Sequence, residues 1–176
     1  NLNLEKRYKW PEGQISNKIG IKQRHISNAS QNTTTLAKTA VKKILKKNNL
    51  SKVKFIISVT NTPTRVFPSL AHEISSLISK SKNFMCMGIN AGCTGYVDAL
   101  YLADKLIKKN QDVLIVTADT YSKYIDINDK SIRPIFSDGA SCTHLQFRKK
   151  NCWKIEKEFF QTESDTLEYL ELKKQK

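Results

Sequence analysis

The sequence predicts an α/β fold in which helices pack on a mainly parallel sheet. Short apolar strand candidates alternate with helical segments, which is the pattern of right-handed βαβ crossovers. These candidates lack a polar residue at every second position, which indicates that helices cover both faces of the sheet. The chain has 176 residues, 39% of them hydrophobic, and is long enough for one domain with its own core.

The first helix is expected after an irregular start. Up to about Ser30 we predict no regular structure, with a turn at residues 10–13, where Pro and Gly lie close together. The threonines at 33–35 offer an N-cap, and residues 48–49, both Asn, end the helix. Its apolar positions follow helical spacing: Leu36, Ala37, Ala40, Val41, Ile44 and Leu45.

Three strands and two further helices follow in alternation. Lys54 to Thr60, Phe84 to Ile89 and Asp112 to Ala118 are short apolar runs, and we expect the second of them to be a buried strand. Ser69 caps a helix whose apolar stripe is Leu70, Ala71, Ile74, Leu77 and Ile78. A third helix after residue 92 is expected to bury Val97, Leu100, Tyr101 and either Asp104 or Leu106–Ile107.

The pattern changes after Asp119. A polar stretch runs to Arg133, and a further strand is predicted at about Ser141 to Phe147. Two late segments, Trp153 to Thr162 and Thr166 to Lys173, are predicted as strands joined by a turn.

The residues from Asn90 to Tyr96 carry the chemistry that the sequence suggests. A strand ends, the chain passes two small residues, and Cys93 begins a helix. The unpaired N–H groups and partial positive charge of a helix N-terminus favour thiolate and can receive an oxyanion. Gly92 and Gly95 leave the backbone open for a thioester. Cys93 is therefore the candidate nucleophile, although a small buried apolar Cys is the plainer interpretation.

The remaining cysteines and the histidines suggest structural roles. Cys86 and Cys142 lie within predicted strands, and Cys152 lies in a charged turn without an activating neighbour. No CxxC pair occurs and the His residues are scattered, so we expect no metal site. We interpret the even cysteine count as free thiols in a reduced, cytoplasmic protein rather than as disulfides.

Several segments, in order, resemble one family. They resemble β-ketoacyl-acyl carrier protein synthase III, the initiating condensing enzyme of bacterial fatty acid synthesis, within the thiolase superfamily. The matching segments are Ile19 to His25, Phe67 to Ser69, Asn90 to Tyr96, Ala118–Asp119 with Asp126 to Lys130, and Phe136 to Ala140. The resemblance covers nearly all of residues 1–176 but corresponds to about the first half of such an enzyme, so we expect the N-terminal half of a thiolase-type layered fold.

The resemblance implies an acyltransferase. Cys93 would accept an acyl group from acyl-CoA or acyl carrier protein, and a malonyl thioester would then lose CO2 and attack it. It implies substrate contacts at Lys18, Lys130 and Phe67, as well as at Gly92 and Gly95, with Phe67 reaching the partner subunit of a homodimer. Phe67 is equally well explained as a loop anchor. The family reaction uses no metal or redox cofactor; CoA and carrier-protein thioesters are the substrates.

Departures from the family pattern leave an alternative open. The family's catalytic His and Asn lie in its second half, and no motif here matches them. A truncated or non-catalytic relative that serves in dimerisation or carrier binding is therefore the second hypothesis. Gln14 stands near the family's adenine-stacking Trp, and Lys18 and Lys130 stand where Arg is usual. Lysine preserves attraction to phosphate but lacks the planar stacking of Arg.

The charge of the chain permits a third, weaker hypothesis. The formal net charge is +14, dominated by Lys. Nucleic acid could attract such a surface, but Arg and aromatic residues are not interleaved with the lysines as on a base-reading platform, so we predict no nucleic-acid partner. An acidic partner such as an acyl carrier protein fits the surplus better. No apolar run is long enough to predict a membrane span.

Overall fold

One mixed sheet organises the molecule in the computed structural model, which describes residues 1–78, 83–148 and 150–163. Its strands are β1 (Val53–Val59), β2 (Met85–Ile89), β3 (Asp112–Thr120) and β4 (Asp138–Leu145), in the order β2-β1-β3-β4. β1 pairs in parallel with both β2 and β3, and β4 runs antiparallel to β3. The mainly parallel sheet predicted from the sequence is confirmed, and β4 begins three residues earlier than expected.

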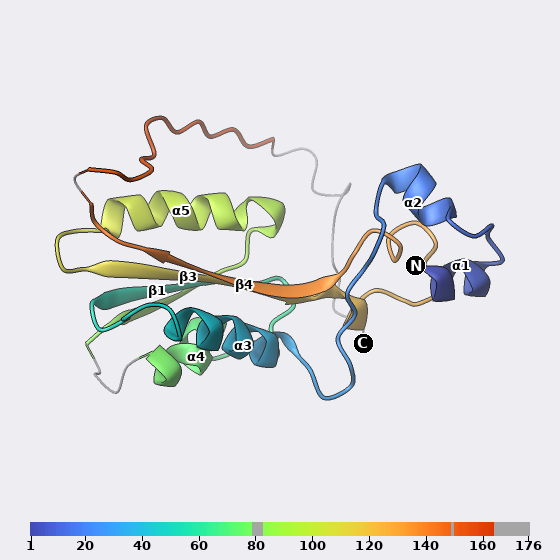
Figure 1. The fold of residues 1–176 in the computed structure, drawn as a ribbon, viewed down its shortest axis with the longest axis horizontal. Coiled ribbons are helices and arrows are strands. Elements are labelled where there is room, and N and C mark those ends of the chain that lie inside the picture. The colour runs from blue at the N-terminus through green and yellow to red at the C-terminus, as the bar shows by residue number, and fades with distance from the viewer. Residues whose placement is uncertain (79–82, 149, 164–176) are drawn as a thin grey trace.

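Helices cover both faces of this sheet (Figure 1). The helices α3 (Thr33–Leu45) and α4 (Leu70–Ile78) lie on one face, and α5 (Gly95–Leu106) lies on the other. The threonine-rich start of α3 is confirmed, but the N-cap is Asn32, which accepts a hydrogen bond of 2.9 Å from the Thr35 amide.

The two layers of helices create two hydrophobic cores. Ile56 of β1 packs with α3 and α4, whereas its neighbour Ile57 packs with α5. On β3, Leu114 likewise packs into the core with α3 and α4, and Ile115 packs into the core with α5. All four side chains are fully buried. Because successive side chains of a strand point to opposite faces, a strand covered on both sides must be apolar throughout. This explains the uninterrupted apolar runs of β1 and β3.

β2 differs from its prediction as a buried strand. Met85 is 43% exposed, and the other residues of β2 are half-buried or exposed. The strand lies at one end of the described sheet, so one of its edges has no neighbouring strand there. The apolar composition located the strand correctly but did not show its position in the sheet.

The buried face of α5 was predicted only in part: Leu100, Leu106 and Ile107 are half-buried and pack against the core, as expected. Gly95, Ala99 and Ala103 face the sheet, whereas Val97 is 62% exposed and Tyr101 is half-buried. Residues spaced by four lie on one face of a helix, and both the small stripe and the bulkier stripe satisfy this spacing. The small stripe faces the sheet and lets the helix approach it closely.

The N-terminal segment is helical, contrary to the prediction. It forms α1 (Leu2–Tyr8) and α2 (Gln14–Ile19), which lie together at one end of the molecule (Figure 1). The carboxylate of Glu5, 3% exposed, accepts hydrogen bonds from the backbone amides of Gly13 and Ile15 and thereby joins the two helices. Around it Leu4, Tyr8 and Ile15 form a small separate core, with Trp10 packed against it.

The late segments do not extend the sheet. Residues 153–162, predicted as a strand, form no regular element and are exposed. They cross the outer side of α5, where Phe160 contacts the Tyr101 ring edge-on at 4.9 Å between centroids. The strand predicted at 166–173 lies outside the described residues. None of the helices in the described part of the chain has the length and apolarity to cross a membrane.

Candidate functional site

Cys93 lies in a tight turn between β2 and α5. β2 ends at Ile89, a 3-10 turn spans Gly92–Thr94, and α5 begins at Gly95. Gly92 has φ +55°, a conformation that residues with a side chain rarely adopt. Cys93 is exposed and precedes the first residue of α5 by two positions, so the predicted position at a helix start is shifted by half a turn.

Gly95 lets this turn sit directly against β1. A Cβ atom at residue 95 would lie 2.6 Å from Cγ1 of Val59, the last residue of β1. That distance is far inside van der Waals contact, so any larger residue would push α5 away from the sheet. The small residue predicted to keep the backbone clear for substrate therefore also has a packing role.

Side chains around the turn fix its shape. The Thr94 hydroxyl lies 2.9 Å from the Ala91 carbonyl oxygen and 3.0 Å from the Asp98 carboxylate, and it donates its one proton to either. Tyr121, which begins the short 3-10 turn Tyr121–Lys123, lies near Cys93 and packs on Phe136 with 4.5 Å between ring centroids. Burial raises the pKa of Tyr121 above its usual value, and the neighbouring Asp119 and Cys93 raise it further. Cys93 therefore lies close enough to Tyr121 to influence its pKa.

Polar residues gather where the parallel strands end. The Oδ1 atom of Asp119, near the end of β3, accepts hydrogen bonds from the amides of Asn61 (2.8 Å) and Thr62 (3.0 Å). The hydroxyls of Thr60 and Thr62 donate to the same oxygen at 3.1 and 2.8 Å. Asn61 in turn donates from Nδ2 to Oδ1 of Asn90, three residues before Cys93. Asp119 was noted as part of a motif and Asn61 and Asn90 were assigned no role.

The signal for these residues was present in the sequence. Asn61, Asn90 and Asp119 each come directly after a predicted parallel strand. The carboxyl ends of parallel strands meet at one edge of a sheet. Their polar side chains were therefore candidates for a common region because the strands were predicted to be parallel, although their individual contacts were not predictable.

Lys18 and Lys130 lie together, as the resemblance implied. Both line a cavity of about 170 Å³ with Trp10 and Gln14. The ammonium group of Lys130 also lies 5.8 Å from the ring centroid of Tyr8. Cys93 does not line this cavity.

Phe67 is exposed and near a second cavity. It is 85% exposed and its neighbour Val66 is 88% exposed. Val66 and Asn90 help to line a cavity of about 240 Å³ at the carboxyl ends of β1 and β2. With this exposure, Phe67 does not act as an anchor among the described residues.

The other thiols differ from Cys93 in their surroundings. Cys86 and Cys142 are half-buried and pack against the core beside α3 and α4. Burial raises the pKa of Cys142 to about 12 and raises that of Cys86 above its usual value. Cys152 is exposed, as Cys93 is, and its thiol lies 3.5 Å from the Arg148 carbonyl.

The histidines have structural surroundings. His144 on β4 is buried and its Nε2 lies 2.9 Å from the Asp112 carboxylate at the start of β3. His72 pairs with the Ser69 hydroxyl at 2.9 Å. In the parts of the chain that the structure describes, His, Cys, Asp and Glu side chains form no group suited to a metal ion.

Comparison with known proteins gives consistent matches in sequence. The family model for 3-oxoacyl-[acyl-carrier-protein (ACP)] synthase III matches residues 87–164. The β-ketoacyl-[acyl-carrier-protein] synthase III of Streptococcus uberis is 38% identical over 144 residues, which are 80% of this chain and 43% of that protein. The synthase III of Wolbachia pipientis is 36% identical over 137 residues, covering 75% and 43% of the two chains.

Solved structures show the same relationship in three dimensions. A crystal structure of a 3-oxoacyl-(acyl-carrier-protein) synthase III matches with a TM-score of 0.77 and 33% identity over 85% of this chain and 46% of that one. The Aquifex aeolicus synthase III matches with a TM-score of 0.77 and 30% identity, over 85% and 49%. The fold is therefore of the thiolase type, and the chain spans less than half the length of the curated relatives cited here.

Proposed function

We propose that this chain, a relative of the β-ketoacyl-acyl carrier protein synthases III over about half of their length, forms the N-terminal, acyl-accepting half of a condensing enzyme. In this proposal Cys93 takes an acyl group from acyl-CoA or acyl carrier protein and holds it as a thioester. The observation that carries the proposal is an exposed thiol in a glycine-flanked turn at the carboxyl end of a parallel strand, directly before a helix.

The first step is a thioester exchange. The Cys93 thiolate attacks the acyl carbonyl carbon, and the carbonyl π electrons move onto oxygen. The tetrahedral oxyanion then collapses, its carbon–sulfur bond to the donor breaks, and the donor leaves as a thiolate that takes up a proton. The start of α5 supports this step because its free backbone N–H groups and partial positive charge stabilise anions that form beside it.

The second step requires groups beyond those of this site. A malonyl thioester loses CO2, and the resulting carbanion attacks the acyl group on Cys93 and displaces the thiolate. His144, His72 and His25 do not supply the base or hydrogen-bond donors for this step, since the first two are engaged in structural contacts and none lies in a segment resembling the family's second half. Condensation therefore belongs to the proposal only for a protein that also contains that second half.

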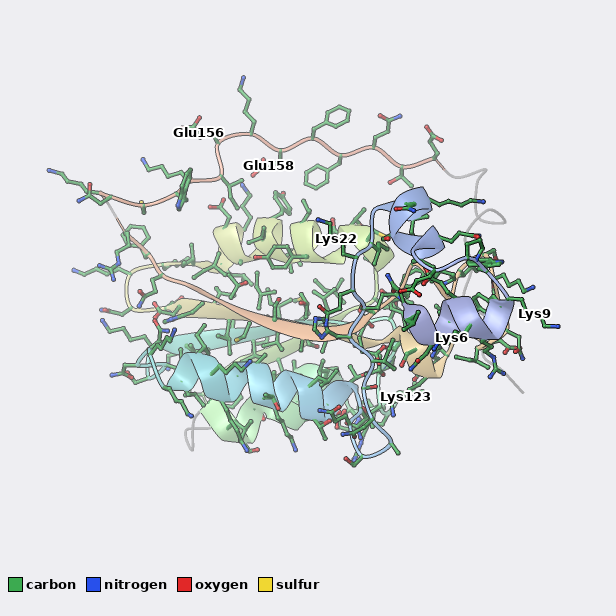
Figure 2. The ribbon with its side chains drawn as sticks, turned by 45° about the vertical axis from the view of Figure 1, so that its right-hand side comes forward. Lys6, Lys9, Lys22, Lys123, Glu156 and Glu158 are labelled. Carbon is green, nitrogen blue, oxygen red and sulfur yellow. The ribbon has the colours of Figure 1, made fainter. Side chains whose placement is uncertain are left out.

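The lysines suggest how a charged donor approaches. Figure 2 shows Lys6, Lys9, Lys22 and Lys123 around the end of the molecule that carries α1 and α2. Lys18 and Lys130 line a cavity at the same end. Phosphate groups of CoA or acidic side chains of a carrier protein would be attracted there.

A homodimer and a reducing compartment complete the proposal. The exposed pair Val66 and Phe67, adjacent to a cavity beside Asn90, fits a role in contacting a second subunit and its acyl pocket. All four cysteines are free thiols, which suits the cytoplasm.

The second candidate is a non-catalytic relative that dimerises or binds a carrier. In this candidate the exposed residues Val66 and Phe67 or the lysines around α1 and α2 serve for contact only, and Cys93 does not react. The two candidates make different predictions for the thiol, because a binding protein has no need to become acylated.

Intact-mass spectrometry after incubation with acyl-CoA or acyl-acyl carrier protein distinguishes them. The catalytic proposal predicts an acyl adduct that Cys93→Ala and Cys93→Ser abolish. Cys152→Ala is the matched control, because Cys152 is also exposed, and this variant should retain the adduct. A folded protein that takes no acyl group from any donor would favour the binding candidate.

A further inference from the structure

We infer that Asn61 and Asn90 are positioning residues whose side-chain bridge ties the Cys93 turn to the loop after β1. The inference rests on the proposed acyl-accepting role of Cys93. Asn61 Nδ2 donates to Asn90 Oδ1 across the gap between two strand ends.

The bridge stands where the backbone pairing of β1 with β2 stops. The last register pair is Val59 with Ile89, and the Thr60 amide then donates to the Ile89 carbonyl at 3.2 Å. Beyond this point the segments that follow β1 and β2 leave the sheet. The Asn61–Asn90 hydrogen bond adds one side-chain contact just beyond the last backbone pair of β1 and β2. The turn that contains Cys93 therefore begins at a residue whose side chain is held in place.

Asn61 is itself held rigidly. Its amide donates to Asp119 Oδ1 at 2.8 Å, and the amide of Thr62 and the hydroxyls of Thr60 and Thr62 donate to the same oxygen. Asp119 belongs to β3, in the interior of the sheet order. The position of Asn61 is therefore set by β3 rather than by the loop alone.

The Cys93 turn gains an external contact through this bridge. The Thr94 hydroxyl contacts the Ala91 carbonyl and Asp98, and both contacts stay within the turn and the first part of α5. Asn90 instead connects the turn to a segment 29 residues earlier in the chain. Cys93 follows this anchor point by three residues, and the anchored turn keeps the thiol in a fixed direction relative to the start of α5.

This arrangement predicts an effect on reactivity with little effect on global stability. The amide pair is exposed, so water replaces the bond when it is lost and the fold keeps its core. Rates that depend on the orientation of a nucleophile are far more sensitive to small displacements.

The test is a double-variant comparison that does not require acyl transfer. In a Cys152→Ala background, the rate constant for alkylation of Cys93 by iodoacetamide is measured for Asn61→Ala, Asn90→Ala and the double variant. We expect each single change to slow alkylation about 3- to 10-fold, because the thiol loses its fixed orientation. The double variant should be no slower than the slower single variant, with Tm unchanged. Asn48→Ala is the control, since that exposed side chain bonds locally to the Ile44 carbonyl.

The outcomes separate this inference from the proposed function. Two results overturn the positioning role, even if the parent becomes acylated by acyl-CoA. In the first, the reductions in alkylation rate of the two single variants multiply in the double variant. In the second, the single variants react as fast as the parent. The expected pattern in a parent that takes no acyl group supports the positioning role and refutes the acyl-accepting function. In a parent that does become acylated, the saturating acylation rate should fall with the alkylation rate while half-saturation stays unchanged.

Discussion

Gly95→Ala tests whether close packing of α5 on β1 sets the position of the Cys93 turn. The added Cβ would lie 2.6 Å from Val59 Cγ1, and carbon atoms pack best at about 3.5–4.0 Å. About 1 Å of relief must therefore come from movement of α5 or of Val59, which is 5% exposed and cannot move into solvent. Overpacking of this kind costs about 1–3 kcal/mol.

Thermal and chemical unfolding measure that cost. We expect Tm to fall by about 2–4 °C for each kcal/mol in a chain of this size. Gly139→Ala is the control, because a Cβ there meets nothing within 4 Å and its φ is not in the left-handed region. This variant should unfold within about 0.5 kcal/mol of the parent.

A second change identifies the cause. Val59→Ala removes the Cγ1 atom that the new methyl group would meet, so Gly95→Ala should cost much less in the Val59→Ala background than in the parent. Equal costs in both backgrounds, or no cost in the parent, would refute the packing argument. The reactivity of Cys93 should fall with stability in the single variant and recover in part in the double variant.

Three further predictions concern a structural carboxylate, the donor cavity and a buried thiol. Burial alone would raise the pKa of Asp138, but hydrogen bonds from Ser122 and Ser27 outweigh it and lower the pKa below its usual value. The ionised form thus stabilises the fold above pH ~4, so Asp138→Asn should lower the free energy of unfolding by about 1–3 kcal/mol at pH 7. This difference between variant and parent should vanish as pH falls through the lowered pKa. A difference that does not change with pH would contradict the prediction. Lys130→Glu should raise the acyl-CoA concentration for half-maximal acylation more at low salt than at high salt. It should also raise it more than Lys46→Glu, a change at the exposed residue that follows α3. Equal shifts for the two variants would exclude attraction at the cavity. With a pKa of about 12, Cys142 should resist iodoacetamide at pH 8 while Cys93 and Cys152 react, and comparable labelling of all three would contradict its burial.

The two interior strands could be predicted from the sequence because burial on both faces requires apolar residues throughout a strand. β1 and β3 pack side chains into both cores, so their apolar runs were unambiguous. β2 has a similar composition but lies at one end of the described sheet, and composition does not record which strand has a neighbour on each side. Its exposure was therefore missed.

The errors in the helices have a related cause. α5 has two stripes at helical spacing, one of small and one of bulky residues, and periodicity does not decide between them. The choice depends on how closely the helix approaches Val59, which is a tertiary contact. α1 and α2 are short and depend on contacts with each other, such as the Glu5 carboxylate bonding across to Ile15, so local patterns alone gave no clear signal.

The position of the candidate thiol could be predicted from the sequence, but the hydrogen bonds around it could not; its role as a nucleophile stays a prediction. Glycines beside Cys93 and the strand before it indicated a reactive turn. The hydrogen bonds from Asp119 through Asn61 to Asn90 join three strand ends that are distant in sequence, and they became visible only with the sheet order. Lys18 and Lys130, by contrast, were placed together by resemblance, and they share one cavity.

The location of the acyl group after reaction with a donor is the most direct test of the central claim. The chain is incubated with acyl-CoA or acyl-acyl carrier protein and digested, and the modified peptide is sequenced by tandem mass spectrometry. The acyl-accepting role predicts the group on Cys93. A group found on Cys152 instead, or an unmodified Cys93 in folded protein with every donor, would contradict it.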